Sequence, residues 1–258
     1  MDVAAYLTRI GHRSRNDATL STLRALHRQH LLSVPFENLD IHLGRPIELR
    51  EEAIFGKVVR ARRGGFCYEL NGLFGWLLDR IGFAVTTISA RVTTGGRMGP
   101  EFDHLALIVQ LGGSWLVDVG FGRSFAEPLE LLPGRVLRQD DCAYRIDEAG
   151  GTWSMWERDP AGAWSERYRF TLAARRLDDF AAMCRHHQTS PDSSFTRERV
   201  CSRLTPDGRL TLTEDRLIEA IGGERRVTPV MSDARYRELL RERFGIDLHG
   251  APWRATRP

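Results

Sequence analysis

The sequence predicts an α+β protein, in which a helical first third precedes an antiparallel sheet or small barrel and a mixed final third. Apolar residues recur at helical spacing as far as residue 81, and β-branched residues become frequent from residue 84. Two apolar runs separated by glycines then form a hairpin pattern over residues 104–122. With 258 residues, the chain is long enough for one large core or for several small subdomains sharing one.

The composition, 42% hydrophobic and 28% charged, is typical of a soluble globular protein. The net charge is only +3 and the basic residues are spread along the chain, so we expect no nucleic-acid partner. No apolar run approaches 18 residues, and the first residues lack the apolar segment of a secretory signal, so we expect no membrane association. Four cysteines do not make a disulfide framework, which favours a reducing cytoplasm.

Three helices are expected in the first third. Helical spacing of leucines and histidines over 20–34 ends at Pro35, because the residue before a proline is pushed towards extended conformations. A second helix is expected around 51–62. The third covers 66–81, with Gly64 and Gly65 just before it and Gly82 as its natural stop.

Strands are expected from residue 84 onwards. The segment 84–92 is rich in β-branched residues, and residues 93–103 have the glycine and proline content of an exposed loop. The hairpin pattern of 104–122 follows, and further strands are expected over 143–146, 152–157 and 164–170. The final third is expected to hold a helix over 177–187, a polar loop, a strand pair around Asp207-Gly208 and a last helix over 232–244.

Cys67 stands out because it follows two glycines at the first turn of a predicted helix. The reactive form of cysteine is the thiolate, and the unpaired N–H groups of a helix N-terminus stabilise it and lower the thiol pKa. The glycines would also let a substrate carbonyl approach the same N–H groups. The alternative is that Cys67 is a small buried apolar residue, as free cysteines often are.

A cysteine nucleophile needs a base, and the base needs an orienting acid. His104 opens the first strand of the hairpin, whereas His27 and His30 lie in the amphipathic helix and are expected to be structural. Asp118 interrupts the apolar second strand, where an unpaired acid would be costly. Asp103 is an alternative acid, although adjacent strand residues point to opposite faces.

The register of the hairpin decides whether Asp118 can reach His104. A two-residue turn at Gly112-Gly113 would put Asp118 on the opposite face. A three-residue loop pairs Gln110 with Ser114 and makes Asp118 the diagonal same-face neighbour of His104, with Gly113 at the positive φ that such loops require. We favour the three-residue loop.

Signatures of other chemistries are absent: the sequence lacks the serine-hydrolase elbow, the zinc-protease helix, the phosphate-binding loop and the dinucleotide fingerprint. The run Cys184-Arg185-His186-His187 has no second cluster with ligand spacing, so we expect a helical surface there and no metal site.

Five segments together resemble the arylamine N-acetyltransferases, in particular the bacterial type. They run in order from SVPFENLD at 33–40 to TSPDSSF at 189–195, with RRGGFCYELN around Cys67, FDHLALIV around His104 and WLVDVGFG around Asp118 between them. The resemblance extends from about Arg9 to Phe195, and the C-terminal third matches only in general character.

The resemblance implies a core similar to that of cysteine proteases and transglutaminases, in three parts. These are an N-terminal helical bundle with the cysteine (1–83), a central antiparallel β-barrel with the histidine and aspartate (84–187), and a C-terminal α/β lid (188–258). It also implies a ping-pong reaction: acetyl-coenzyme A acetylates Cys67, coenzyme A leaves, and an aromatic amine or hydrazine attacks the thioester. His104 would move the protons, Asp118 would orient His104, and no metal or prosthetic group would be needed.

Further residues match family positions one by one. A charged network beside the active site is expected from Arg9, Glu37 and Arg63, although surface charge is the alternative for Arg9. We expect Phe36, Val92 and Phe121 to line the acceptor pocket, although each could instead belong to the core. Gly122 is expected to be a small residue beside the cysteine. Phe195 is expected to lie near the coenzyme or acceptor. Backbone N–H groups of Thr94, Gly95 and Gly96, with Arg97, are expected to contact the coenzyme pyrophosphate.

Three other functions are considered. Related enzymes on the same scaffold form macrolactam amides from polyketide chains, and differ in pocket size and acyl donor. A cysteine-protease-like hydrolase would use water as the acceptor, and a binding protein without activity would not need an intact Cys67, His104 and Asp118.

Overall fold

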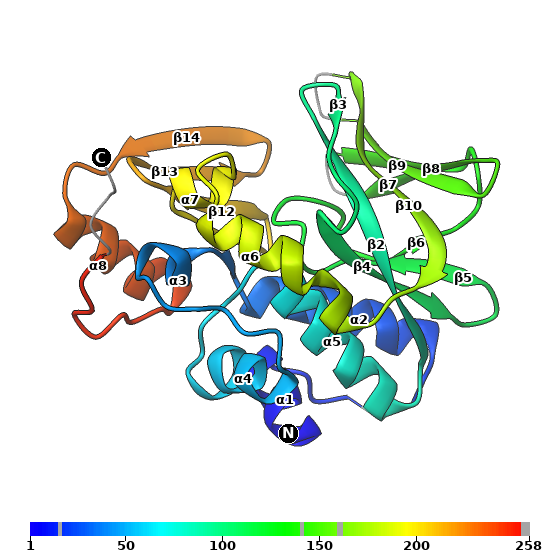
Figure 1. The fold of residues 1–258 in the computed structure, drawn as a ribbon, viewed down its shortest axis with the longest axis horizontal. Helices are drawn as coiled ribbons and strands as arrows, with labels where there is room; N and C mark the ends of the chain where they lie inside the picture. The colour runs from blue at the N-terminus through cyan, green and yellow to red at the C-terminus, as the bar shows by residue number, and fades with distance from the viewer. Residues whose placement is uncertain (15–16, 140–141, 159–161, 254–258) are drawn as a thin grey trace.

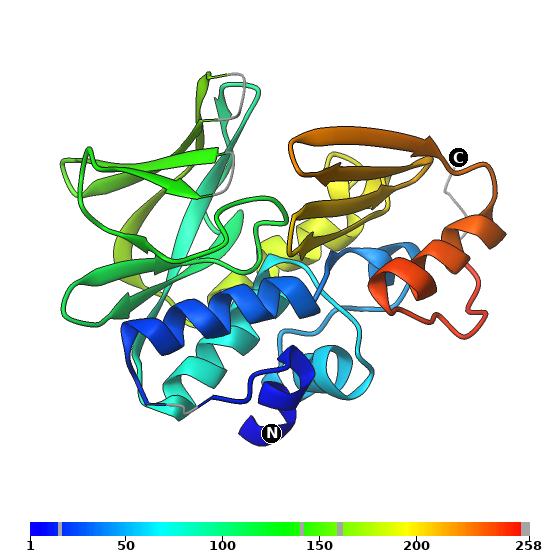
Figure 2. The same ribbon diagram turned by 180° about the vertical axis from the view of Figure 1, so that it is seen from behind.

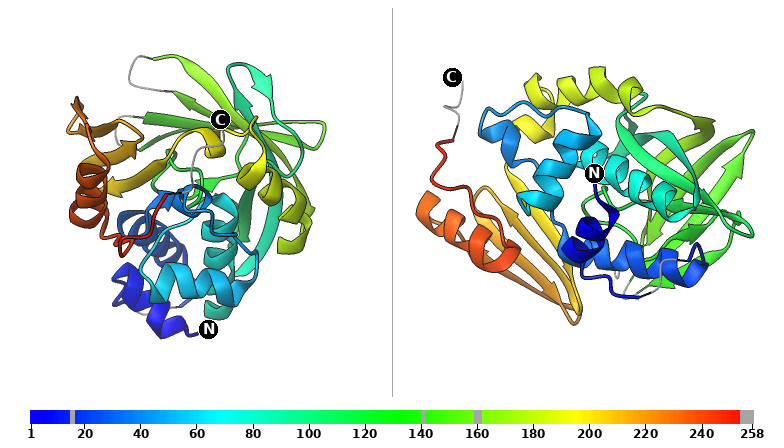
Figure 3. Two further views of the ribbon diagram at one scale, coloured as in Figure 1. Left: turned by 60° about the vertical axis from the view of Figure 1, so that its left-hand side comes forward. Right: turned by 90° about the horizontal axis from the view of Figure 1, so that it is seen from below.

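The computed structural model describes residues 1–14, 17–139, 142–158 and 162–253. The N-terminal helices form one end of the molecule, and two antiparallel sheets rise from them side by side (Figure 1). Seen from the helical end, α1 (Val3–Ile10) and α2 (Leu20–Ser33) lie in front, with the C-terminal sheet on one side and the larger sheet on the other (Figure 3). Among the described residues, no helix is long and apolar enough to cross a membrane.

The helical end confirms the predicted helices and adds two short elements. Its elements are α1 (Val3–Ile10), α2 (Leu20–Ser33), α3 (Leu39–His42), α4 (Glu51–Phe55), a π-helical turn (Gly56–Arg60) and α5 (Cys67–Ile81). The Thr19 side chain caps α2 by accepting from the Thr22 N–H, and α2 ends two residues before Pro35. Helix α5 ends at Gly82, whose φ of 106° lies in the left-handed region.

The larger sheet is antiparallel and curls into a nearly closed barrel (Figure 2). Its strands are β2 (Ala84–Thr94), β3 (Arg97–Met98), β4 (His104–Gln110), β5 (Ser114–Val117), β6 (Leu129–Glu130), β7 (Val136–Gln139), β8 (Cys142–Ala149), β9 (Thr152–Arg158) and β10 (Trp164–Ala174). The spatial order is β6-β5-β4-β2-β10-β9-β8-β7, with β3 beside β2. A buried apolar cluster that includes Ile88, Leu116 and Tyr168 fills its interior.

Part of the predicted loop 93–103 is a hairpin instead. Strand β2 continues to Thr94, and Thr94 pairs with Arg97 across a turn made by Gly95 and Gly96. Both glycines have a positive φ, 56° and 77°, as a two-residue hairpin turn requires. The glycines that predicted an irregular loop therefore close a tight turn.

The hairpin of β4 and β5 has the predicted register, with Gln110 opposite Ser114. The prediction of which glycine has positive φ was wrong. Gly112 has a φ of 61°, whereas Gly113 has none in the positive range. A hydrogen bond of 2.7 Å from the Leu111 N–H to the Gly113 carbonyl closes the loop.

The C-terminal part begins with a 3-10 turn (Leu177–Phe180), α6 (Ala181–Thr189) and α7 (Ser194–Arg197). A second sheet follows in the order β1-β11-β12-β13-β14, in which β1 (Phe36–Glu37) comes from the helical end. The other strands are β11 (Val200–Thr205), β12 (Gly208–Thr213), β13 (Arg216–Ile221) and β14 (Glu224–Pro229), and α8 (Asp233–Phe244) packs on the sheet. The sequence did not predict β13 or β14, because β14 is exposed along its whole length and has no apolar face.

Candidate active site

Cys67 is the first residue of α5, and its side chain is only 3% exposed. The segment before it is pressed against residues 35–37: the Glu37 N–H donates to the Gly65 carbonyl at 2.8 Å, and the Gly65 N–H donates to the Pro35 carbonyl at 3.4 Å. A Cβ on Gly64 would lie 1.9 Å from the Pro35 oxygen. Neither Gly64 nor Gly65 has a positive φ, so this pair of glycines serves close packing of backbones and not an unusual backbone conformation.

His104 and Asp118 form the predicted pair across the hairpin of β4 and β5. Nε2 of His104 donates to Oδ2 of Asp118 at 2.8 Å, and both side chains are buried. Tyr168 donates its hydroxyl to the same Oδ2, and the Gly120 N–H donates to Oδ1. Burial acts to raise the pKa of Asp118, but the charge and hydrogen bond of His104 and the other donors lower it below its usual value.

Asn71 connects the cysteine helix to this pair. It lies four residues after Cys67, so the two side chains share one face of α5. Its amide donates to Oδ1 of Asp118 at 2.8 Å and to the Leu105 carbonyl at 2.6 Å, and its oxygen accepts from the Val119 N–H at 2.8 Å. The turn that carries Cys67 is thereby held against the strand ends that carry the histidine and the aspartate.

A glycine allows the segment after β5 to pack directly against the turn of Cys67. A Cβ on Gly120 would lie 2.8 Å from the Cα of Cys67 and 2.7 Å from Nδ2 of Asn71. The glycine beside the cysteine is therefore Gly120. Gly122, which the sequence-based analysis assigned to that place, lies against the ring of Phe36, 3.3 Å from where its Cβ would be.

The thiol differs from the sequence-based expectation in one property. Burial raises the pKa of Cys67 well above its usual value, and the hydrogen bond from the Leu105 backbone opposes this only in part. The prediction that the helix N-terminus would give a lowered thiol pKa is therefore wrong for the protein without substrate. A thiol of this kind depends on a neighbouring base to remove its proton.

Two residues that contact Asp118 had no readable signal in the sequence. Tyr168 comes from β10, fifty positions beyond Asp118, and reaches it only because β10 lies next to β2 in the barrel sheet. His27 was predicted to be structural, and it is fully buried, but it also accepts from the Asp118 backbone N–H at 3.4 Å. Asn71 could have been found, because helical periodicity puts it on the face of Cys67.

A family model for N-acetyltransferases matches residues 19–253 of the chain. Human arylamine N-acetyltransferase 1 is 36% identical over 275 residues, which cover 96% of this chain and 95% of the human protein. The chain belongs to the arylamine N-acetyltransferase family. Among solved structures, the arylamine N-acetyltransferase from Salmonella typhimurium superposes with a TM-score of 0.90 at 32% identity, over 97% of this chain and 94% of that one. That of Mycobacterium marinum in complex with CoA gives 0.88 at 32% identity, over 95% and 93%.

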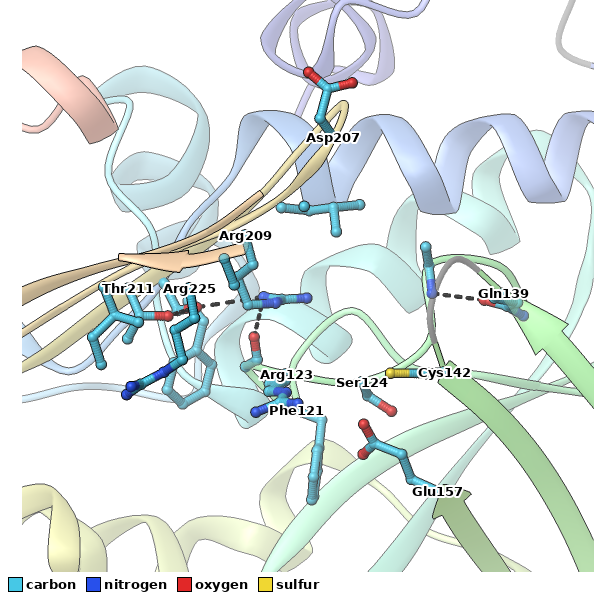
Figure 4. Close-up of a pocket in the computed structure, with 18 of the residues that line it drawn as sticks. Phe121, Arg123, Ser124, Gln139, Cys142, Glu157, Asp207, Arg209, Thr211 and Arg225 are labelled. Carbon is cyan, nitrogen blue, oxygen red and sulfur yellow. Dashed lines mark hydrogen bonds between the residues drawn. The ribbon is translucent and has the colours of Figure 1, made fainter. Parts of the chain in front are cut away.

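A cavity of about 1020 Å³ opens beside the buried pair, between the barrel sheet and the C-terminal sheet (Figure 4). Phe36, Phe121 and Gly122 are among the residues that line it, and their assignment to an acceptor pocket stays a prediction. The ring of Phe121 meets the ring of His104 edge-on, with centroids 5.1 Å apart. The cavity therefore reaches Phe121, which contacts His104, whereas Cys67, His104 and Asp118 do not themselves line it.

The remaining positions expected from the family lie elsewhere. Val92 is in β2 opposite Tyr168, and Phe195 packs on Phe36 and Phe66 with ring centroids 6.2 and 5.9 Å apart; neither lines the cavity. The predicted coenzyme contacts, Thr94, Gly95, Gly96 and Arg97, form the tip of the β2–β3 hairpin and also lie outside the cavity lining.

The charged network forms as expected around Glu37 and Arg63, which are buried and joined at 2.7 Å. Arg63 also pairs with Asp40, and Lys57 joins Asp40 to Glu69 at 2.8 and 2.9 Å. Arg9 takes no part in these ion pairs, but it is buried and donates to backbone carbonyls, including those of residues 62 and 63. Surface charge, the alternative for Arg9, is excluded.

Proposed function

We propose that the protein transfers an acetyl group from acetyl-coenzyme A to the amine of an arylamine or arylhydrazine through an acetyl thioester on Cys67. The observation that carries this proposal is the pairing of His104 with Asp118 on a hairpin that Asn71 ties to the turn of Cys67. Membership of the arylamine N-acetyltransferase family supports the same donor and acceptor classes.

In the first half-reaction, His104 takes the proton of the Cys67 thiol as the sulfur attacks the acetyl carbonyl. The tetrahedral intermediate collapses, the bond to the coenzyme sulfur breaks, and the proton on His104 passes to the departing thiolate. Backbone N–H groups at the start of α5 are the donors best placed for the oxyanion. The raised pKa of Cys67 makes this general-base step necessary.

In the second half-reaction, the amine attacks the thioester, His104 accepts the amine proton, and the Cys67 sulfur leaves. The nucleophile must be neutral, which suits weakly basic aromatic amines at pH 7. Asp118 keeps the Nε2–H of His104 engaged and leaves the other ring nitrogen as the base. The four cysteines are free thiols in the structure, which suits the reducing cytoplasm that we propose for the protein.

The test is the intact mass of the protein after mixing with acetyl-coenzyme A, followed by peptide mapping. We expect a gain of one acetyl group on the peptide that contains Cys67, and its loss when an aromatic amine is added. The other three cysteines should stay unmodified, and Cys67→Ala should take up no acetyl group. An unmodified parent protein, or turnover by Cys67→Ala above background, would refute the covalent mechanism.

The same assay separates this proposal from the macrolactam synthase considered from the sequence. Such an enzyme would ignore acetyl-coenzyme A and accept an acyl group from a carrier-protein thioester. The shared triad would act in both cases, so the acyl donor and not the identity of the residues decides between them.

A further inference from the structure

The first turn of α5 is capped from inside the protein by Glu69. Phe66, the residue before the helix, has no polar side chain that could cap it, and Oε2 of Glu69 accepts from the Phe66 N–H at 3.1 Å. Gly65 leaves room for this carboxylate, because a Cβ on Gly65 would lie 2.7 Å from Oε2 of Glu69. The hydrogen bond spans Cys67, since it joins the residue before the cysteine to the residue two positions after it.

Lys57, the only lysine of the chain, holds that carboxylate in place. It lies in the π-helical turn, and its Nζ is 2.9 and 3.1 Å from the two oxygens of Glu69 and 2.8 Å from Oδ2 of Asp40. The side chain of Glu69 is 2% exposed and that of Lys57 is 14% exposed. One ammonium group with three donors therefore joins two carboxylates that would otherwise repel each other away from water.

The opposite charges of Lys57 and Glu69 sustain each other. Burial raises the pKa of Glu69, and the charge and hydrogen bond of Lys57 act against this rise. Burial also acts to lower the pKa of Lys57. The charges of Glu69, Glu37 and Asp40 outweigh that effect and raise the pKa above its usual value, so the ammonium group stays protonated. Among the described residues, no other cation lies within ion-pair distance of Glu69.

We propose that Glu69 and Lys57 are a positioning pair for the reaction at Cys67, in which Glu69 fixes the first turn of α5 and Lys57 fixes and neutralises the Glu69 carboxylate. The inference rests on the proposed function, in which the sulfur and the oxyanion gain negative charge at this helix end. An uncompensated carboxylate two residues away would oppose that charge in a buried site, where water screens it weakly. A displaced first turn would also move the N–H groups proposed for the oxyanion.

The test separates the acceptor oxygen of Glu69 from the charge of Lys57. Glu69→Gln keeps an oxygen for the Phe66 N–H, whereas Glu69→Met has a similar length and no such acceptor. We expect Glu69→Met to slow Cys67 acetylation by about tenfold or more, and Glu69→Gln to stay within about threefold of the parent. Lys57→Met should also slow acetylation by about tenfold, because it leaves the carboxylate uncompensated.

The double variant Lys57→Met/Glu69→Gln should recover most of the lost rate. It removes both charges and keeps the acceptor oxygen, while Asp40 keeps its ion pair with Arg63. Arg60→Gln is the matched control and should leave the rate unchanged, because the Arg60–Glu52 pair in the same region is exposed. Rates are compared at temperatures where urea unfolding shows each variant to be folded. Equal rates in Glu69→Met and Glu69→Gln, or no recovery in the double variant, would show that the pair stabilises the fold without positioning the thiol.

The parent protein provides a second readout that needs no substitution in the pair. Because the chain has one lysine, protein labelled with ¹⁵N-lysine has one side-chain amine signal, that of Lys57. We expect this signal to shift when Cys67 is alkylated with iodoacetamide, and to stay in place when Cys67→Ala is treated in the same way. An unchanged signal in the alkylated parent would contradict the connection between the pair and the thiol.

The rate of alkylation keeps this inference separate from the proposed function, since it requires no acyl transfer. It should follow the same order among the variants as the rate of acetylation. If the parent takes up no acetyl group from any thioester but the alkylation rates show this order, the proposed function fails and the positioning pair stands. If the parent is acetylated and the variants do not differ, only the positioning pair fails.

Discussion

Nδ2 of Asn71 lies 2.8 Å from Oδ1 of Asp118, so the helix that begins at Cys67 is bonded directly to the acid on the neighbouring hairpin. The same amide donates to the carbonyl of Leu105, the residue after His104. One side chain therefore fixes the position of the cysteine turn relative to both other members of the proposed triad. The amide nitrogen and the amide oxygen of Asn71 are both hydrogen-bonded inside the protein, where an unpaired polar group is costly.

Asn71→Ala should lower both activity and stability. It removes two donors and one acceptor from a fully buried position, which we expect to cost about 1–3 kcal/mol of unfolding free energy. The rate of Cys67 acetylation should fall at least tenfold at a temperature where the variant is folded. Urea unfolding and single-turnover mass measurements check the two effects, with Asp79→Ala, an exposed change on the same helix, as the control. A folded Asn71→Ala protein with a normal acetylation rate would contradict the positioning role.

Asp118→Asn should lower the acetylation rate by about 10⁴, the effect known for loss of a triad orienter, because the amide no longer fixes the imidazole tautomer. Asp103→Asn is the matched control. Asp103 precedes His104 in sequence but pairs with His187 at 3.2 Å, so its variant should keep its rate within a few-fold. Stopped-flow release of the coenzyme thiol measures both. A near-normal rate in Asp118→Asn would point to another acid.

His27 should make stability depend on pH. Its Nδ1 donates to the Ala126 carbonyl and its Nε2 accepts from the Asp118 N–H, so the buried ring is neutral, and burial lowers its pKa to about 4. Between pH 6.5 and 4 the unfolded chain binds a proton at this residue that the folded protein does not. The unfolding free energy should therefore fall by up to about 3 kcal/mol as the pH drops through this range.

The substitution His27→Gln isolates that contribution. The stability advantage of the parent over His27→Gln should shrink by about the same amount between pH 7.5 and pH 4, since the other titrating groups are common to both proteins. Urea unfolding curves at several pH values provide the comparison. A difference that is constant with pH would show that His27 is not held neutral.

Gly64→Ala should destabilise the protein by about 1–3 kcal/mol or more, because the new methyl group would meet the Pro35 carbonyl oxygen at 1.9 Å and force two backbones apart. Gly56→Ala is its counterpart: the added methyl group has nothing within 4 Å, and the backbone there is helical. It should be neutral or stabilising by up to about 1 kcal/mol. Thermal or urea unfolding of both variants tests the pair, and equal stabilities would sink the close-packing argument.

The sequence carried enough information for the proposed triad but not for its surroundings. Cys67 was marked by its glycines, and the pairing of His104 with Asp118 followed from the hairpin register, because the alternation of strand side chains is strict. The pKa of Cys67 was not predictable in this way, since its direction is set by burial in the assembled fold. Local pattern describes the element on which a group lies, while its electrostatic environment comes from elements far away in sequence.

The same limit explains the missed residues. Tyr168 reaches Asp118 only because its strand β10 lies beside β2 in the barrel sheet. Strand β14, with its charged and exposed residues, has no alternating pattern to detect. Non-local strand pairing therefore determined most of what the sequence did not reveal. The division of the chain at residues 83 and 187 stays a prediction.

Residues 36 and 37 contact two separate parts of the molecule. On one side Phe36 and Glu37 pair with β11 of the C-terminal sheet, and on the other Phe36 bridges to Gly65, two positions before Cys67. If the C-terminal sheet were exchanged for that of a relative, we therefore expect the backbone before Cys67 to change position through this connection. Chimaeras of this kind should differ in the speed of acyl transfer even where every residue around the sulfur is identical.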